Sequence, residues 1–124
     1  MLMGKKDRKI FIIDIDGVIC ENIPNEEAWR MLDAEPIPGA KETINRWYDE
    51  GHYICFFTAR TDEHKDVTIE WLRKHGFKYH QIIFNKPRGG NYHYIDDLPV
   101  RATRFKGRFT RFIRKLKEIE IFEE

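Results

Sequence analysis

The chain has 124 residues, of which 41% are hydrophobic and 35% charged, and its net charge is +1. This balance is typical of one soluble globular domain over residues 1–124, and it excludes a globally basic nucleic-acid binder while leaving a local basic patch open. No apolar run approaches the length of a membrane span or a signal peptide. Cys20 and Cys55 are expected to be free thiols, so we expect a cytoplasmic protein without a membrane partner.

Apolar runs and capping residues predict strands that alternate with helices. The predicted strands cover residues 9–16, 53–58, 81–84 and 92–95. The predicted helices cover residues 26–32 (capped by Asn25), 39–50, 62–75 and a terminal stretch from 108 to about 119. The alternation implies an α/β fold whose mainly parallel sheet carries helices on both faces, with the first strand buried on both sides. A short turn at residues 88–91 leaves the pairing of the last strand open.

Polar side chains follow each predicted strand. They are Asp14 and Asp16 after the first, Thr58 at the end of the second, Lys86 just beyond the third, and Asp96 and Asp97 after the fourth. Parallel strands bring their carboxyl ends to one edge of the sheet, which is where open α/β sheets bind ligands. Alternation along a strand points Asp14 and Asp16 the same way. Crowded carboxylates need a cation, and a set of oxygen ligands favours Mg²⁺ over Zn²⁺.

Four motifs together resemble the haloacid dehalogenase (HAD) superfamily of phosphohydrolases across about residues 9–105. They are Asp14-Ile15-Asp16-Gly17-Val18, Phe57-Thr58-Ala59-Arg60, Lys86-Pro87 and Tyr94-Ile95-Asp96-Asp97. The resemblance implies a three-layer Rossmann-like fold. Residues 18–38 and 59–85 are too short for a folded cap domain, so we expect the capless type with an open site.

The resemblance also implies catalytic roles. Asp14 would be the nucleophile that forms an aspartyl-phosphate, and Asp16 the acid that protonates the leaving alcohol and then activates water. Thr58 would donate its hydroxyl to phosphate oxygens together with the backbone amide of Ala59. Lys86 would screen the phosphate charge.

Further roles concern the metal and the mouth of the site. Mg²⁺ would be held by the carboxylates of Asp14, Asp16, Asp96 and Asp97, with the Ile15 carbonyl as an additional ligand. Arg60 lies near the mouth and is a candidate to grip phosphate or a remote anionic group. Arg88 is a second candidate there and a substitute for the lysine.

The function predicted first is a Mg²⁺-dependent phosphatase of a small phosphomonoester, with a sugar phosphate as the substrate class. One alternative is a phosphatase of nucleotides or nucleic-acid ends, motivated by the open site and by the basic, Phe-containing stretch 101–117. The structural alternative, which is the more common one for such a stretch, is that its phenylalanines face the core and its basic side chains face the solvent. The other alternative is a non-catalytic binding module, against which the intact motif residues argue. An open site also predicts either a homo-oligomer, with Trp29 as a contact, or a substrate larger than a simple monophosphate.

Overall fold

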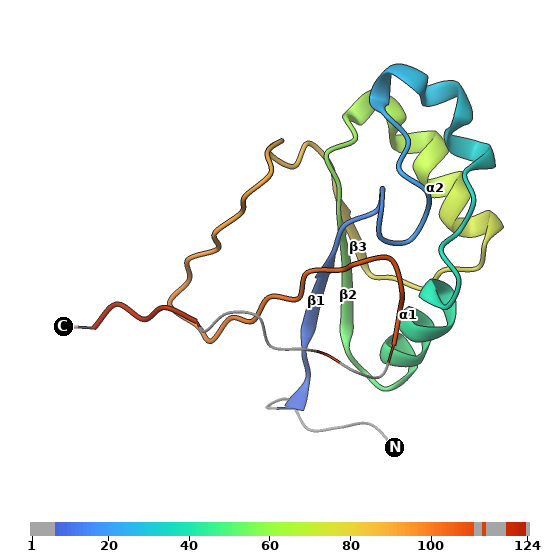
Figure 1. Cartoon of the computed structure of the whole chain (residues 1–124). Coiled ribbons are helices and arrows are strands. Elements are labelled where there is room, and N and C mark those ends of the chain that lie inside the picture. Colours follow the sequence, from blue (N-terminus) through green and yellow to red (C-terminus); the bar gives the residue numbers. More distant parts are fainter. Residues whose placement is uncertain (1–6, 111–112, 114–118, 124) are drawn as a thin grey trace.

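Three parallel strands form the centre of the computed structural model, which describes residues 7–110, 113 and 119–123 (Figure 1). Strands β1 (Ile10–Ile13), β2 (Tyr53–Phe57) and β3 (Gln81–Ile83) pair in the order β1-β2-β3. Phe11 is in register with Ile54. The structure therefore confirms the predicted α/β fold and its parallel, Rossmann-like sheet.

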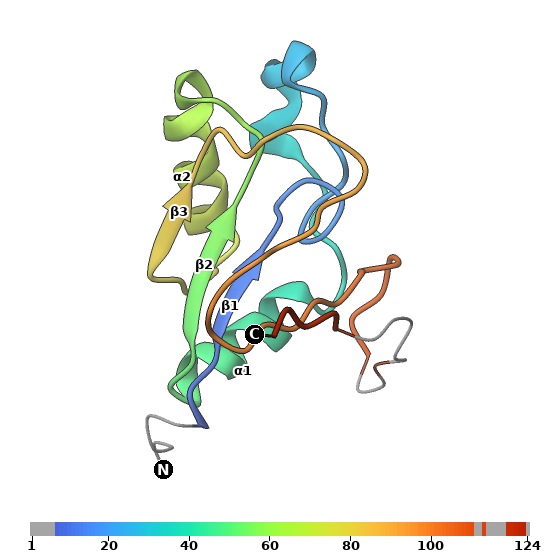
Figure 2. The same ribbon diagram turned by 90° about the vertical axis from the view of Figure 1, so that its left-hand side faces the viewer.

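Two helices connect the strands. Helix α1 (Ala40–Asp49) precedes β2, and helix α2 (Lys65–Lys74) precedes β3 after a short 3-10 turn, η3 (Asp62–His64). Both helices lie on the same side of the sheet in Figures 1 and 2. This is the expected result of right-handed crossovers that always step in the same direction across a sheet.

The prediction of helices on both faces is therefore wrong for the described part of the chain. The terminal helix predicted from residue 108 is not seen in the described residues either, because residues 108–110, 113 and 119 are irregular. The other residues of that predicted helix, 111–112 and 114–118, lie outside the described residues.

The segment between β1 and α1 carries one further helix, the 3-10 helix η2 (Asn25–Asp33). It confirms the predicted helical turn but not the predicted cap, because the preceding residue is Pro24 and Asn25 is the first residue of the helix. The Asn25 side-chain amide instead donates to the Ala59 carbonyl at 3.4 Å. Asn25 thereby joins η2 to the loop that follows β2.

The core lies between the sheet and its helices. It includes Ile44 of α1, Ile54 and Phe56 of β2 and Trp71 of α2, all 1% exposed or less. The Trp71 indole nitrogen donates to the Ala34 carbonyl at 2.9 Å, which satisfies the polar atom of a buried aromatic residue and fixes α2 to the end of η2. Cys20 and Cys55 are free thiols, as predicted, and both are buried.

Strand β1 is covered on one side only. Phe11 and Ile13 pack on the core, and the Phe11 ring stacks on Trp47 at 4.1 Å. Ile10 and Ile12 point the other way and are 67% and 56% exposed. The prediction that this strand is buried on both faces is wrong, because α1 and α2 share a face and no other described helix covers Ile10 and Ile12.

The predicted fourth strand is also wrong. Residues 92–95 are irregular and exposed, with Tyr92 at 56% and Ile95 at 70%. A parallel neighbour needs a crossover of about a dozen residues or more, and the segment between Ile83 and Tyr92 is shorter than that.

None of the helices in the described part has the length and apolar character to span a bilayer.

A matched pair of substitutions tests the one-sided burial of β1. We predict that Ile54→Ala lowers the free energy of unfolding by about 2–5 kcal/mol, because it opens a cavity in the core. Ile12→Ala should cost less than about 1 kcal/mol, because its side chain is already in water. Chemical denaturation of both variants measures the difference, and an Ile12→Ala loss as large as that of Ile54→Ala would show that the outer face is covered.

Candidate active site

A tight turn follows β1 and presents two aspartates at its carboxyl end. Gly17 has a positive φ of 83°, which only glycine adopts at little cost. Its amide donates to the Cys20 carbonyl at 2.9 Å. The amides of Val18 and Ile19 donate to the Ile15 carbonyl at 3.1 and 3.0 Å. The Ile15 carbonyl, whose role as a metal ligand stays a prediction, thus accepts two hydrogen bonds within the turn.

Asp14 pairs with the lysine predicted to act with it. The Lys86 ammonium lies 3.7 Å from Asp14 Oδ2, and the Ile15 amide donates to Asp14 Oδ1 at 2.8 Å. Burial raises the pKa of Asp14, Lys86 and the Ile15 amide lower it, and the nearby charge of Asp16 raises it. The net shift of the pKa is upward. The ionised form of Asp14 is therefore less stable in the folded chain than it is in water.

Backbone hydrogen bonds hold the loop after β2 against the segment after β3. The Thr58 amide donates to the Ile83 carbonyl at 2.9 Å, and the Lys86 amide donates to the Thr58 carbonyl at 2.9 Å. A third bond runs from the Asn85 amide to the Arg60 carbonyl at 2.8 Å. The structure thus brings Thr58 and Lys86 together, as their positions after neighbouring strands predicted.

The side chains of Thr58 and Lys86 are both enclosed. Thr58 is fully buried, and its hydroxyl oxygen accepts from the Arg60 amide at 3.1 Å. The Lys86 ammonium lies over the Tyr92 ring at 4.6 Å from its centroid and 5.8 Å from that of Phe57. These cation–π contacts favour the position of the ammonium beside Asp14. Sequence reasoning missed Tyr92 because it placed this residue in a strand.

Asp16 has a different partner from Asp14. Its two oxygens accept from Arg60, with Nε 2.9 Å from Oδ2 and Nη2 2.8 Å from Oδ1. The Arg60 side chain is 1% exposed and that of Asp16 is 17% exposed. Strand alternation predicted a shared direction for Asp14 and Asp16, but β1 ends at Ile13 and the rule does not reach Asp16.

Arg60 was predicted to lie near the mouth and meet an anion of the ligand. The structure buries its guanidinium against Asp16 and Thr68 instead. The sequence does carry one signal for this pairing, because the loops that follow adjacent parallel strands lie side by side. Arg88, the other candidate at the mouth, is exposed.

Asp96 and Asp97 lie in the exposed segment after β3. The Asp96 carboxylate accepts from the Tyr94 hydroxyl at 2.6 Å and from the Leu98 amide at 3.0 Å, and these bonds lower the pKa of Asp96. Within residues 7–110, 113 and 119–123, no group of three or more His, Cys, Asp or Glu side chains is placed to hold a metal ion. The side chains as arranged here do not form the predicted Mg²⁺ site, which stays a prediction.

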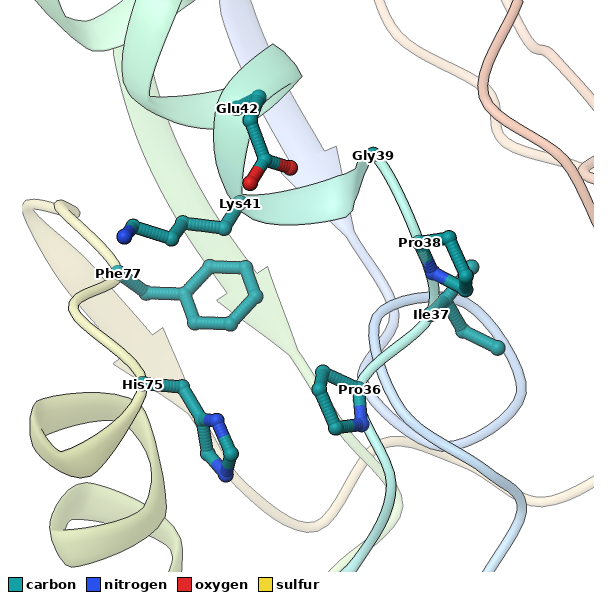
Figure 3. Close-up of a pocket in the computed structure, with 8 residues that line it drawn as sticks. All are labelled: Pro36, Ile37, Pro38, Gly39, Lys41, Glu42, His75 and Phe77. Carbon is teal, nitrogen blue, oxygen red and sulfur yellow. The ribbon is translucent and has the colours of Figure 1, made fainter.

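A separate hollow of about 240 Å³ lies beside the first turn of α1 (Figure 3). It is lined by Pro36, Ile37, Pro38, Gly39, Lys41, Glu42, His75 and Phe77. None of these residues is among the predicted site residues. The candidate active site is therefore the sheet edge around Asp14 and not this hollow.

Known proteins that are similar to this chain agree with its fold. The fold is a Rossmann-like α/β fold, with carboxylates and a lysine at one edge of a parallel sheet. Residues 11–118 match the family described as PITM 1-3, LNS2 domain, and the chain belongs to this family. A crystal structure of an MCSG target from Vibrio cholerae is similar, with a TM-score of 0.55 and 26% identity over 75% of this chain and 83% of the other.

Two curated relatives carry names that state an activity. A putative nucleotidase of Bacillus cereus is 41% identical over 49 residues, which are 40% of this chain and 26% of the relative. A putative 5'(3')-deoxyribonucleotidase of Chlorobaculum tepidum is 33% identical over 82 residues, which are 60% of this chain and 41% of the relative. The chain thus aligns with only about a quarter and two fifths of these relatives. Their names agree with the phosphatase class that the four motifs imply.

The raised pKa of Asp14 leads to a prediction about stability and pH. The folded chain binds the Asp14 proton more tightly than the unfolded chain, so the stability that this proton contributes is lost as pH rises through the folded pKa. We therefore predict that Asp14→Asn raises the melting temperature relative to wild type at pH 7. This advantage should shrink as pH falls through the raised pKa of Asp14 and be lost below the ordinary aspartate pKa.

Thermal melts of both proteins between pH 3 and 7 measure this difference. Asp33→Asn, which removes an exposed carboxylate, controls for the loss of one negative charge. An Asp14→Asn variant that is less stable than wild type at pH 7 would contradict the raised pKa.

Proposed function

We propose that this chain is a phosphomonoester hydrolase that acts on nucleotides through an aspartyl-phosphate at Asp14. The observation that carries the proposal is the Lys86 ammonium 3.7 Å from Asp14 Oδ2, at the sheet edge where Thr58 also lies. A carboxylate attacks a phosphate dianion only where cationic groups offset the repulsion between them. The two nucleotidase names support nucleotides as the substrate class, which favours the alternative reading of the sequence over the sugar phosphate predicted first.

The proposed reaction has two steps. An Asp14 oxygen bonds to phosphorus while the ester P–O bond breaks, and the leaving oxygen takes the broken bond's electron pair and a proton from Asp16. Water then attacks phosphorus, gives one proton to Asp16, and releases phosphate and the Asp14 carboxylate. Proton transfer of this kind contributes about 10²–10⁴-fold. Lys86, Thr58 and the Ala59 amide would hold the phosphate oxygens.

We further propose that the site is of the capless type. Between β1 and α1 the described chain adds only η2 and its flanking loops, and Trp29 of η2 is 78% exposed. A nucleotide offers a base and a sugar beyond the reacting phosphate, and these parts can supply the binding energy that a small phosphate lacks. A homo-oligomer that covers the mouth remains the other proposal for this open site, and nucleic-acid ends are a further substrate class.

The central test combines Asp14→Asn with a substrate panel. We expect Asp14→Asn to abolish turnover because it removes the nucleophile, while the variant stays folded in a thermal melt. Wild type should hydrolyse deoxyribonucleoside 5'- and 3'-monophosphates with a larger kcat/KM than sugar phosphates. The exposed control Asp33→Asn should keep full activity.

Three results would contradict the proposal in different ways. Near-normal activity of Asp14→Asn would remove the covalent mechanism. A preference for sugar phosphates would restore the substrate class predicted first. A wild-type chain that leaves p-nitrophenyl phosphate intact would favour the non-catalytic binding module.

Metal dependence has its own test. We propose that Mg²⁺, when bound, supplies positive charge at the phosphate, as the resemblance to HAD phosphatases implies. Turnover should fall to background in EDTA and return with added Mg²⁺. Full activity in EDTA would overturn the metal proposal, whereas the Lys86–Asp14 geometry would be unaffected.

A further inference from the structure

We propose that Arg60 is a positioning residue that fixes the Asp16 carboxylate for proton transfer. This inference rests on the proposed phosphatase function, because it concerns the residue assigned to the leaving group. Arg60 binds both oxygens of Asp16, through Nε at 2.9 Å and Nη2 at 2.8 Å. Two bonds from one planar guanidinium fix the plane of a carboxylate as well as its position.

Burial makes Arg60 depend on contacts with other protein groups. The Arg60 side chain is 1% exposed, so its charge has little access to water and depends on its protein partners. The guanidinium therefore has to be oriented by groups other than Asp16 if it is to hold Asp16 in one place. Two sets of contacts meet this need.

The first set joins Arg60 to helix α2. Arg60 Nη1 donates to the Thr68 hydroxyl at 3.0 Å, and that hydroxyl donates to the His64 carbonyl at 2.8 Å. Thr68 is 1% exposed. The guanidinium is thus held between Asp16 on one side and the first turn of α2 on the other.

The second set joins the Arg60 backbone to the rest of the site. Its amide donates to the Thr58 hydroxyl oxygen at 3.1 Å, and its carbonyl accepts from the Asn85 amide at 2.8 Å. Arg60 is therefore anchored at both its backbone and its guanidinium. It connects the carboxylate after β1 to the phosphate-binding candidates after β2 and β3.

Asp14 does not share this support. In the described part of the chain, its carboxylate contacts the Lys86 ammonium and the Ile15 amide. Losing the Arg60 contacts should therefore displace Asp16 more than Asp14. Proton donation to a leaving oxygen depends on hydrogen-bond geometry, and an ester with a good leaving group depends on it less. The consequence is a selective loss on substrates with poor leaving groups.

The test uses phenyl phosphate, which has a poor leaving group, and p-nitrophenyl phosphate, which has a good one. Arg60→Lys keeps the positive charge and loses the two-bond geometry. We expect it to lower kcat/KM for phenyl phosphate by about tenfold or more and that for p-nitrophenyl phosphate by no more than about threefold. Competitive inhibition by inorganic phosphate should change less than about twofold, because phosphate binding stays intact. Thr68→Val, which loses one anchor, should show a smaller loss of the same pattern.

A double-mutant cycle with Asp16→Asn separates positioning from a general structural effect. If Arg60 acts through Asp16, Arg60→Lys combined with Asp16→Asn should be no slower than Asp16→Asn alone. Arg73→Lys, an exposed arginine paired with Glu70 on α2, is the matched control and should leave both substrates unaffected. Thermal melts establish that each variant is folded.

Several outcomes would overturn the inference. Equal losses on both substrates, or losses that multiply in the double variant, would leave Arg60 a structural residue only. Weaker inhibition by phosphate with unchanged kcat would mean that Arg60 grips the substrate, as the sequence first suggested.

Wild-type activity on aryl phosphates without activity on nucleotides would remove the proposed substrate class and leave this test intact. A chain inactive on all of them would remove both proposals.

Discussion

The ion pair between Arg60 and Asp16 joins the two loops on which the candidate site is built. One loop follows β1 and the other follows β2, and the two residues are 44 positions apart in sequence. Removing one partner of a buried ion pair typically costs about 3–5 kcal/mol, because the other charge is left unpaired. The pairing therefore restricts the loop after β1 to conformations in which Asp16 meets Arg60.

The two aspartates of the site are stabilised in opposite ways. Asp16 is matched by a buried guanidinium on both oxygens. Asp14 has one ammonium at 3.7 Å and a pKa that burial raises. An incompletely compensated carboxylate is a stronger nucleophile candidate than a fully paired one, because less interaction energy is lost when its oxygen turns to an electrophile. The weaker pairing of Asp14 thus fits the nucleophilic role proposed for it.

The sequence predicted the elements whose signals are local. Apolar runs marked β1, β2 and β3, and the spacing of apolar residues between capping residues marked α1 and α2. The positions of Thr58 and Lys86 also followed from local rules, because each comes directly after a strand of a parallel sheet. The free state of the Cys20 and Cys55 thiols was also predicted.

Features that depend on distant neighbours could not be derived in this way. A short apolar run such as residues 92–95 forms a strand only if another strand is within reach, and the sequence does not state whether one is. The exposure of Ile10 and Ile12 depends on which face of the sheet the helices cover. The burial of Arg60 depends on a carboxylate in another loop, whereas its charge alone favoured the surface.

Strand order links these features to the site. Because the order is β1-β2-β3, β1 is an edge strand of the described sheet and has a hydrogen-bonded neighbour on one side only. Its outer face is also exposed at Ile10 and Ile12. The loop that carries Asp14 and Asp16 therefore takes little support from a strand on that side. It is held instead by its own turn around Gly17, by the Lys86 ammonium at Asp14, and by Arg60 at Asp16. In this arrangement the charged groups that serve the proposed chemistry also hold the edge of the sheet on which that chemistry depends.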